Sequence, residues 1–205
     1  MKTAETSSAY INEYIAALND VMSKFDPIEF EKIINILVEA YRKDKQVFIV
    51  GNGGSAATAN HFVCDFGKNA VPFDSKESGT GPGKRRFRII SVCDNIEKIT
   101  ALANDIAFEE IFRQQLINLM NEEDVLIVIS ASGNSPNLVR ACEYAKEKKS
   151  RIIVLAGFQG GKIKEFADAA MVVPLESYEQ IEDLHLVILH MIVYYFKNHP
   201  EILDS

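Results

Sequence analysis

The stretch VFIVGNGGSAATANHF, residues 47–62, decides the fold class of this chain. Residues 46–50 form a short, mostly apolar run rich in β-branched side chains, which indicates a strand buried on both faces and therefore a parallel strand. The run ends at Gly51, and the helical pattern of residues 55–68 follows after a glycine-rich turn. A buried strand that leads through such a turn into a helix is typical of α/β proteins.

Similar apolar runs return along the chain, with helical patterns between them. The further expected strands are residues 88–92, 125–129, 151–155 and a shorter fifth at 170–173. The expected helices are residues 97–119, 137–148, 162–166 and a last one at 178–197. This alternation predicts a three-layer, doubly wound α/β fold with a parallel five-stranded sheet.

Two helices are expected ahead of the first strand. Residues 8–24 carry apolar side chains at helical spacing, and Asp26 is a capping residue directly before a proline at the start of a second helix. We therefore predict a single domain over residues 1–205, with an N-terminal helix hairpin over 1–44 and an α/β core over 45–205.

The stretch DSKESGTGPGKRR, residues 74–86, breaks this pattern and predicts a long loop. A solvated insertion is the simpler interpretation. The basic residues Lys84, Arg85 and Arg86 at its end suggest a lid that reaches over an anionic ligand.

Composition excludes several classes of protein. The chain has 205 residues, of which 47% are hydrophobic and 25% charged, with a net charge of −7. So acidic a chain is poorly suited to hold nucleic acid or an anionic membrane through its overall field, and we expect neither as a partner. Three cysteines without CxxC spacing and the lack of an apolar signal or membrane-spanning stretch predict a cytoplasmic protein with reduced thiols.

Two loops at expected strand ends are suited to bind an anion. GNGGS spans residues 51–55, and SASGNSP spans residues 130–136, each directly before a helix. Glycine leaves backbone amides free to face a ligand, and a helix start adds partial positive charge. Ser135 is explained as a helix cap, but capping does not explain Ser130 and Ser132. The second loop, residues 130–136, is called the serine loop below, and its hydroxyl groups predict a phosphate site.

The first loop also fits the dinucleotide fingerprint Gly-x-Gly-x-x-Ala at Gly51, Gly53 and Ala56. That fingerprint requires an acidic residue about 20 positions on, at the end of the next strand. Here the next strand ends only near Asp94, and a dinucleotide would leave the serine loop without a role. The dinucleotide interpretation is therefore disfavoured.

Four side chains are suited to chemistry if the fold brings them together. His61 and Asp65 share a face of one helix, and Glu182 and His190 lie on neighbouring sides of the last helix. Two imidazoles and two carboxylates can bind a divalent metal ion of the zinc or manganese kind, or transfer protons beside a carbonyl. Alone, each is better explained as a packing or solvated residue, and we expect His185 to be a hydrogen-bonded helix histidine.

Five stretches of the chain together resemble the SIS (sugar isomerase) domain family, most closely its phosphoheptose isomerase subfamily. They are VFIVGNGGSAATANHFVCDF, ALANDIAFEEIF, VLIVISASGNSPNLVRA, VLAGFQGGKIKEFAD and EQIEDLHLVILH. The resemblance extends over almost the whole chain, including the two N-terminal helices. The resemblance implies the SIS fold and a phosphosugar aldose–ketose isomerase acting by enediol proton transfer. The implied reaction converts sedoheptulose 7-phosphate to D-glycero-D-manno-heptose 7-phosphate.

The resemblance also implies a role for individual residues. The expected substrate-binding residues are Asn52, Gly53, Gly54, Ser55, Asn104, Asp105, Ser130, Ala131, Ser132, Ser135 and Glu182. The expected ligands of a divalent metal ion, with zinc the first candidate, are His61, Asp65, Glu182 and His190. The expected catalytic residues are Asp65, Glu182 and His190. A homotetramer with sites at subunit interfaces is implied as well.

Two positions depart from the family pattern. Asp65 stands where the family has a glutamate general base, and Glu182 stands where it has a glutamine. Aspartate is one methylene shorter, so it reaches less far toward a substrate carbon. We hypothesise that Glu182 and His190 flank the reacting carbons while His61 and Asp65 hold the metal ion.

Two other functions stay open. A non-catalytic sugar-phosphate-binding protein, such as the DnaA initiator-associating protein of the same family, keeps the loops but lacks the last histidine, which this chain has as His190. An isomerase for another sugar phosphate, such as arabinose 5-phosphate, is the second alternative. Asp65 and Glu182 depart from the family pattern, and an arginine of the family is missing next to Lys68.

Overall fold

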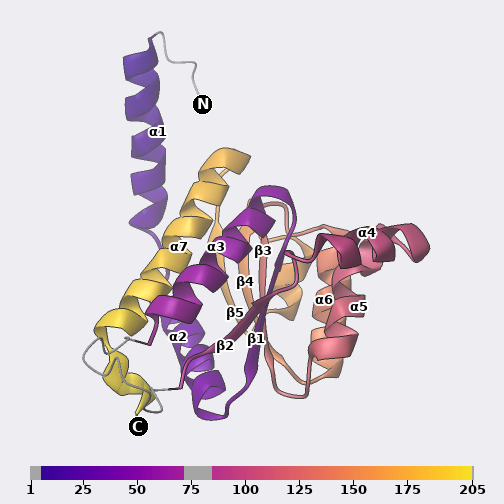
Figure 1. Ribbon diagram of the computed structural model, residues 1–205. Helices are drawn as coiled ribbons and strands as arrows, with labels where there is room; N and C mark the ends of the chain where they lie inside the picture. Colours follow the sequence, from indigo (N-terminus) through magenta and orange to yellow (C-terminus); the bar gives the residue numbers. More distant parts are fainter. Residues whose placement is uncertain (1–5, 72–84, 205) are drawn as a thin grey trace.

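The computed structural model of the chain describes residues 6–71 and 85–204, and it contains a parallel sheet between two layers of helices (Figure 1). The strands lie in the order β2-β1-β3-β4-β5, and all neighbouring pairs run parallel. They are β1 (Gln46–Gly51), β2 (Arg88–Ser91), β3 (Val125–Ser130), β4 (Arg151–Gly157) and β5 (Ala169–Val173). The predicted five-stranded doubly wound sheet is confirmed.

Helices cover both faces of this sheet. The α-helices are α1 (Ser7–Met22), α2 (Pro27–Arg42), α3 (Gly53–Asn69), α4 (Ile96–Asp105), α5 (Ile111–Leu119), α6 (Pro136–Glu147) and α7 (Tyr178–Asn198). Short 3-10 turns are η2 (Phe108–Glu110), η3 (Lys162–Phe166) and η4 (Pro200–Leu203). None of the helices in the described ranges is both long enough and apolar enough to cross a bilayer.

Alternate residues of each strand face two separate cores. Val47 and Ile49 pack with α2, α3 and α7, whereas Phe48 and Val50 pack with α5 and α6. All residues of β1 and β3 are buried. The continuous apolar runs in the sequence therefore arise because both faces of the sheet are covered.

The helix expected over residues 97–119 is in fact two helices. α4 ends at Asp105, and Ala107 has an extended backbone (φ −170°, ψ 152°) that separates it from η2 and α5. The amide of Asn104 donates to the carboxylate of Asp105 at 2.8 Å. Such polar side chains compete with helical hydrogen bonds, which favours a helix end here.

The two N-terminal helices form at the expected places but do not pack as a hairpin. α2 lies on the sheet next to β5, whereas α1 extends beyond the body of the protein and packs mainly against α7 (Figure 1). The Tyr14 hydroxyl donates to the Asp183 carboxylate at 2.6 Å, which ties α1 to α7. Tyr10, Ile11 and Ile15 stay exposed, so the apolar side of α1 is not buried against α2.

The long loop expected at residues 74–86 falls mostly outside the described residues. Its last part starts at Arg85, whose guanidinium lies 4.5 Å from the centre of the Tyr41 ring and 3.8 Å from Asp44. These partners lie at the end of α2, at the edge of the sheet opposite the two predicted loops. Arg85 is therefore held away from the predicted anion site of its own chain.

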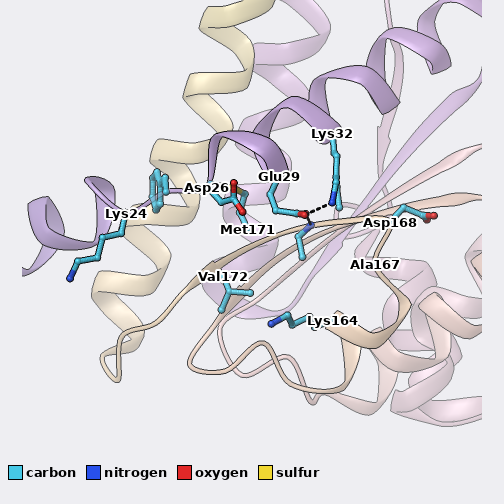
Figure 2. A pocket seen from close by; sticks show the side chains of 12 residues that line it. Lys24, Asp26, Glu29, Lys32, Lys164, Ala167, Asp168, Met171 and Val172 are labelled. Carbon is cyan, nitrogen blue, oxygen red and sulfur yellow. Dashed lines mark hydrogen bonds and ion pairs between the residues drawn. The ribbon is translucent and has the colours of Figure 1, made fainter.

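The start of α2 covers the edge strand β5 (Figure 2). Glu29 accepts a hydrogen bond from the backbone N–H of Ala170 at 2.8 Å and pairs with Lys32 at 2.6 Å. Both contacts hold the pKa of Glu29 below its ordinary value, so it stays a carboxylate. A hollow of about 500 Å³ runs along this edge. Because the Glu29 carboxylate occupies the N–H of Ala170, it hinders pairing of another strand at that point of the edge.

Candidate functional site

The two predicted loops lie together at the carboxyl edge of the sheet. β1 ends at Gly51 and β3 ends at Ser130, and these strands are neighbours. Gly53 begins α3 in the left-handed region (φ +52°), which glycine adopts without steric cost. Ligands of open α/β sheets bind at this edge, so the position fits the predicted phosphate site.

The serine loop keeps hydroxyl protons available for a ligand. Ser130 is buried, and its Oγ accepts a bond from the N–H of Gly133 at 3.0 Å. The Oγ of Ser132 accepts from the N–H of Asn134 at 3.3 Å. Ser135 is the N-cap of α6 without a side-chain capping bond. Because a hydroxyl can donate while it accepts, each of the three serines retains a donor for phosphate oxygens.

The loop after β4, residues 158–161, packs together with the start of η3 against the serine loop. The N–H of Ile163 donates to the carbonyl of Gly133 at 3.0 Å. Gly133 has a φ of +65°, and a Cβ there would lie only 2.1 Å from the carbonyl oxygen of Gly160. The two loops therefore touch backbone to backbone. The signal in the sequence was the glycine pair Gly160-Gly161.

Glu182 meets the first loop and not the histidines. A Cβ at Gly54 would lie 2.2 Å from Glu182 Oε2, so the carboxylate rests against the backbone where α3 begins. A negative charge is favourable at a helix start. The carboxylate thus occupies the place where an anion could meet α3. The serine loop remains as the better site for phosphate.

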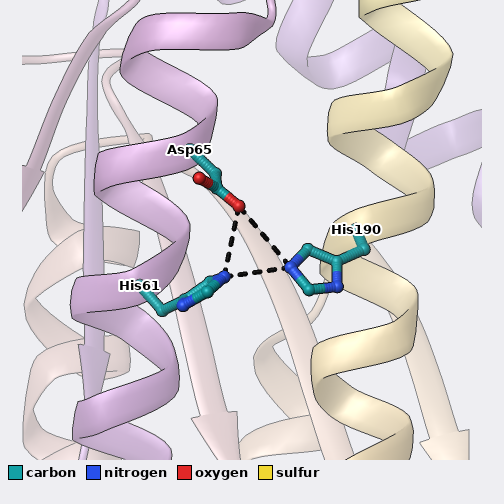
Figure 3. A group of neighbouring side chains, drawn as sticks. All are labelled: His61, Asp65 and His190. Atoms are coloured by element: carbon teal, nitrogen blue, oxygen red, sulfur yellow. Dashed lines mark hydrogen bonds and ion pairs between the residues drawn. The ribbon is translucent and has the colours of Figure 1, made fainter.

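His61, Asp65 and His190 converge on the outer side of α3 and α7 (Figure 3). The Nε2 atom of His61 lies 2.9 Å from Nε2 of His190 and 3.1 Å from Oδ2 of Asp65. His190 Nε2 lies 3.5 Å from the same carboxylate oxygen. The side chains are 49% exposed for each histidine and 28% for the aspartate. The cluster is therefore open to solvent and to ligands.

These separations fit one bound metal ion. Two ligand atoms on the same tetrahedral zinc ion lie about 3.3 Å apart, close to the three distances in the cluster. Two imidazole nitrogens and one carboxylate oxygen form a common ligand set for zinc, and three protein ligands leave a position for water or substrate. Within the described residues, Glu182 does not join this group.

The loops and the cluster lie at different levels of the same helix pair. α3 and α7 lie side by side, and their early residues Gly54 and Glu182 meet, as do the later His61 and His190. The two helices therefore run in the same direction. Seven residues separate Gly54 from His61, which is about 10 Å along the axis. A ligand that reaches both the loops and the cluster must be elongated.

The other expected residues are placed less directly. Asn104 and Asp105 are exposed at the end of α4, and no hydrogen bond joins them to either loop within the described residues. Ser55 is buried in the first turn of α3, and Ala131 is buried in the serine loop. The three cysteines are free thiols.

His185 is buried beside the backbone of Ala156, and its ring nitrogens make no hydrogen bond of ordinary geometry within the described residues. It is 0% exposed, and the contact with Ala156 only partly offsets the effect of burial on its pKa. Burial lowers the pKa of His185 to about 4. The ring is therefore neutral near pH 7 and lies within the apolar layer between α7 and the sheet.

Comparison with known proteins gives a consistent result. Residues 9–157 match the family model described as SIS domain. A phosphoheptose isomerase of Helicobacter pylori (strain P12) is 36% identical over 162 residues, 78% of each chain, and one of Geobacter sp. (strain M21) is 32% identical over 189 residues, 92% of each. The structure of phosphoheptose isomerase GmhA from Neisseria gonorrhoeae aligns with a TM-score of 0.80 at 26% identity, covering 93% of this chain and 96% of that one.

The same fold also occurs in more distant proteins. The Vibrio vulnificus NanR protein complexed with ManNAc-6P aligns with a TM-score of 0.65 at 12% identity, covering 99% of this chain and 66% of that one. At this identity the likeness concerns the fold alone.

Proposed function

The chain belongs to the SIS domain family, and we propose that it interconverts sedoheptulose 7-phosphate and D-glycero-D-manno-heptose 7-phosphate. The observation that carries this proposal is the convergence of His61, Asp65 and His190 about two helix turns from the phosphate-binding edge of the sheet. That separation is comparable to the length of an open-chain heptose phosphate. The substrate would thus reach from the serine loop to the cluster.

The serine loop would hold the phosphate and so orient the rest of the sugar. Ser130, Ser132 and Ser135 offer hydroxyl donors, and α6 begins directly behind them. Remote binding of this kind converts affinity for the phosphate into correct placement of the reacting carbons. Glu182, beside Gly54, is placed to accept hydrogen bonds from sugar hydroxyls between the two ends.

The isomerisation needs a base that removes a proton from one carbon and returns it to the next. We assign this role to Asp65, because its carboxylate lies with His190 at the cluster, whereas Glu182 lies about 12 Å along α7 from His190. His190 is placed to donate a proton to the carbonyl oxygen as the enediol forms. This assignment replaces the hypothesis that Glu182 and His190 flank the reacting carbons.

We further propose that the cluster holds a divalent metal ion, with zinc the first candidate. His61, Asp65 and His190 would be its protein ligands, and their separations fit such an ion. Bound to Nε2 of His190, the ion would take the place of that proton donor and would polarise the carbonyl group of the sugar as a Lewis acid, while the second carboxylate oxygen of Asp65 would remain available as the base.

We also propose that the chain works as a homotetramer in the cytoplasm, with each site closed by a neighbouring subunit. The cluster is exposed, and a groove of about 450 Å³ beside it is lined by His190, Met191 and Tyr194. Met191 and Tyr194 expose large apolar surfaces. A neighbour on this groove would exclude water from the reacting end. A monomer in light scattering would contradict this assembly.

The reaction is tested with pure protein and a panel of sugar phosphates. We expect turnover of sedoheptulose 7-phosphate, loss of activity with a chelator, and recovery when zinc is added. Metal analysis of protein purified without chelator tests the ion directly. Turnover of arabinose 5-phosphate alone would change the substrate. Binding of sugar phosphates without any turnover would instead identify a non-catalytic binding protein.

A further inference from the structure

A pair of side-chain amides joins the two loops at the carboxyl edge. Asn52 Nδ2 donates to Asn137 Oδ1 at 2.9 Å, and Asn137 Nδ2 donates to Asn52 Oδ1 at 2.9 Å. The two residues are 85 positions apart in the sequence. Asn137 is 1% exposed, in the first turn of α6, directly behind the serine loop.

Asn52 makes this contact in place of the capping hydrogen bond that its position favours. It is the N-cap of α3, a position where asparagine normally accepts a bond from its own helix. Here it makes no side-chain capping bond. Its donor and its acceptor both face Asn137 instead. The long-range pair has therefore replaced the local cap.

We propose that Asn137 is a positioning residue that fixes the distance between the serine loop and the first loop. The pair attaches Gly53 and Gly54, with the Glu182 carboxylate against them, to the helix that begins at the serine loop. In terms of the proposed function, phosphate bound at one loop is thereby set at a fixed distance from the groups that meet the sugar. Asn137 acts through Asn52 and touches no substrate itself.

Asparagine is well suited to this role. A side-chain amide offers a donor and an acceptor side by side, so two amides can bond reciprocally. Aspartate at position 137 would keep the acceptor and lose the donor. Alanine would lose both and leave the amide of Asn52 without its partner.

The experiment compares Asn137→Ala, Asn52→Ala and the double variant with the original protein. Amide hydrogen exchange is measured on peptides covering residues 51–56, together with kcat and KM for sedoheptulose 7-phosphate. We expect Asn137→Ala to accelerate exchange in that distant loop and to lower kcat/KM by about 30-fold, the equivalent of two hydrogen bonds of ordinary strength. The double variant should be no worse than Asn52→Ala alone, because Asn137 acts only through its contact with Asn52.

Gln46→Ala is the matched control. Gln46 is also buried and donates a side-chain amide bond, to the carbonyl of Arg88 at 2.6 Å, but it lies at the opposite edge of the sheet. It should lower the melting temperature without changing exchange in residues 51–56 or kcat/KM. Asn137→Asp, which keeps the size of the side chain, covers the case in which Asn137→Ala does not fold, and it too should accelerate exchange there.

Unchanged exchange in residues 51–56 upon loss of the Asn137 amide would overturn the proposal. Losses of kcat/KM that add up in the double variant would overturn it as well, because they would show that the two side chains act independently. If the original protein turns over no heptose phosphate, the proposed function fails on its own. The exchange measurement then still decides whether Asn137 positions the first loop.

Discussion

The two edges of the sheet use their polar groups in opposite ways. At the amino edge, buried Asp124 accepts hydrogen bonds from the backbone N–H groups of Gln46 at 2.9 Å and Asn121 at 2.7 Å. Its carboxylate is therefore engaged in hydrogen bonds within the protein. At the carboxyl edge, serine hydroxyls keep their protons, and about two helix turns away from it His61 and His190 are half exposed. Polar groups that the fold does not use internally therefore mark the functional side of this molecule.

The largest effect should come from the functional side. Asp65→Asn keeps the shape of the side chain but removes the proposed base and a metal ligand. We expect kcat to fall by about 1,000-fold or more, as is usual for loss of a proton acceptor. The melting temperature should hardly change, because this side chain is partly exposed. Steady-state kinetics and thermal unfolding measure both quantities, and near-normal turnover would move the base elsewhere.

The amino edge should respond in the opposite sense. Asp124→Ala leaves the buried backbone N–H of Gln46 and the partly buried one of Asn121 without partners, which costs about 3 kcal/mol of unfolding free energy. The variant that remains folded should keep its kcat and KM. Urea unfolding and kinetics test this, and a selective loss of activity would contradict the division between the two edges.

The buried His185 should make stability depend on pH. Its pKa is about 4 in the folded protein, below the ordinary value of 6.5, so the unfolded chain binds the proton more readily. Stability should therefore fall as the pH drops below 6.5 toward 4, by about 2 kcal/mol at pH 5. Above pH 6.5 this group contributes no pH dependence.

Unfolding free energies between pH 5 and pH 7 provide the measurement. His185→Phe should flatten the curve, because no buried imidazole remains to be protonated. His199→Gln, at a half-exposed position near the end of the chain, should leave the curve unchanged. An unaltered curve in His185→Phe would assign the pH dependence to other groups.

The smallest effect is expected at Glu182. Glu182→Gln keeps the size of the side chain against Gly54 and removes only its charge. If Glu182 orients the sugar, KM should rise less than about 10-fold with kcat nearly unchanged, the loss of one ordinary hydrogen bond. Abolished turnover with intact sugar phosphate binding would restore Glu182 as the base.

Much of this architecture follows from the sequence because it rests on local patterns. Continuous apolar runs such as residues 125–129 identify buried parallel strands, and the helical spacing of His61 and Asp65 puts them on one face. The break at Ala107 was missed although Asn104 and Asp105 favour a helix end, because the apolar pattern continues beyond them. The exposure of the apolar face of α1 could not be predicted, since amphipathic spacing does not say what a helix packs against.

The candidate site was predicted in its parts and not in its arrangement. Spacing alone could not tell that Glu182 turns to Gly54 while His190 turns to His61, because that depends on how α7 lies against α3. The bond between Asn52 and Asn137 links positions 85 apart and leaves no periodic signal. Such contacts become visible only when the chain is folded.

The parallel course of α3 and α7 has an evolutionary consequence. Both helices start near the carboxyl edge, so the imidazoles meet only if the residue count along each helix is kept. Inserting one residue between Glu182 and His190 would swing the second imidazole by about 100° around its axis. A single insertion would then abolish catalysis and leave the phosphate-binding loops intact. A non-catalytic sugar-phosphate-binding protein could therefore evolve from such an enzyme in one step.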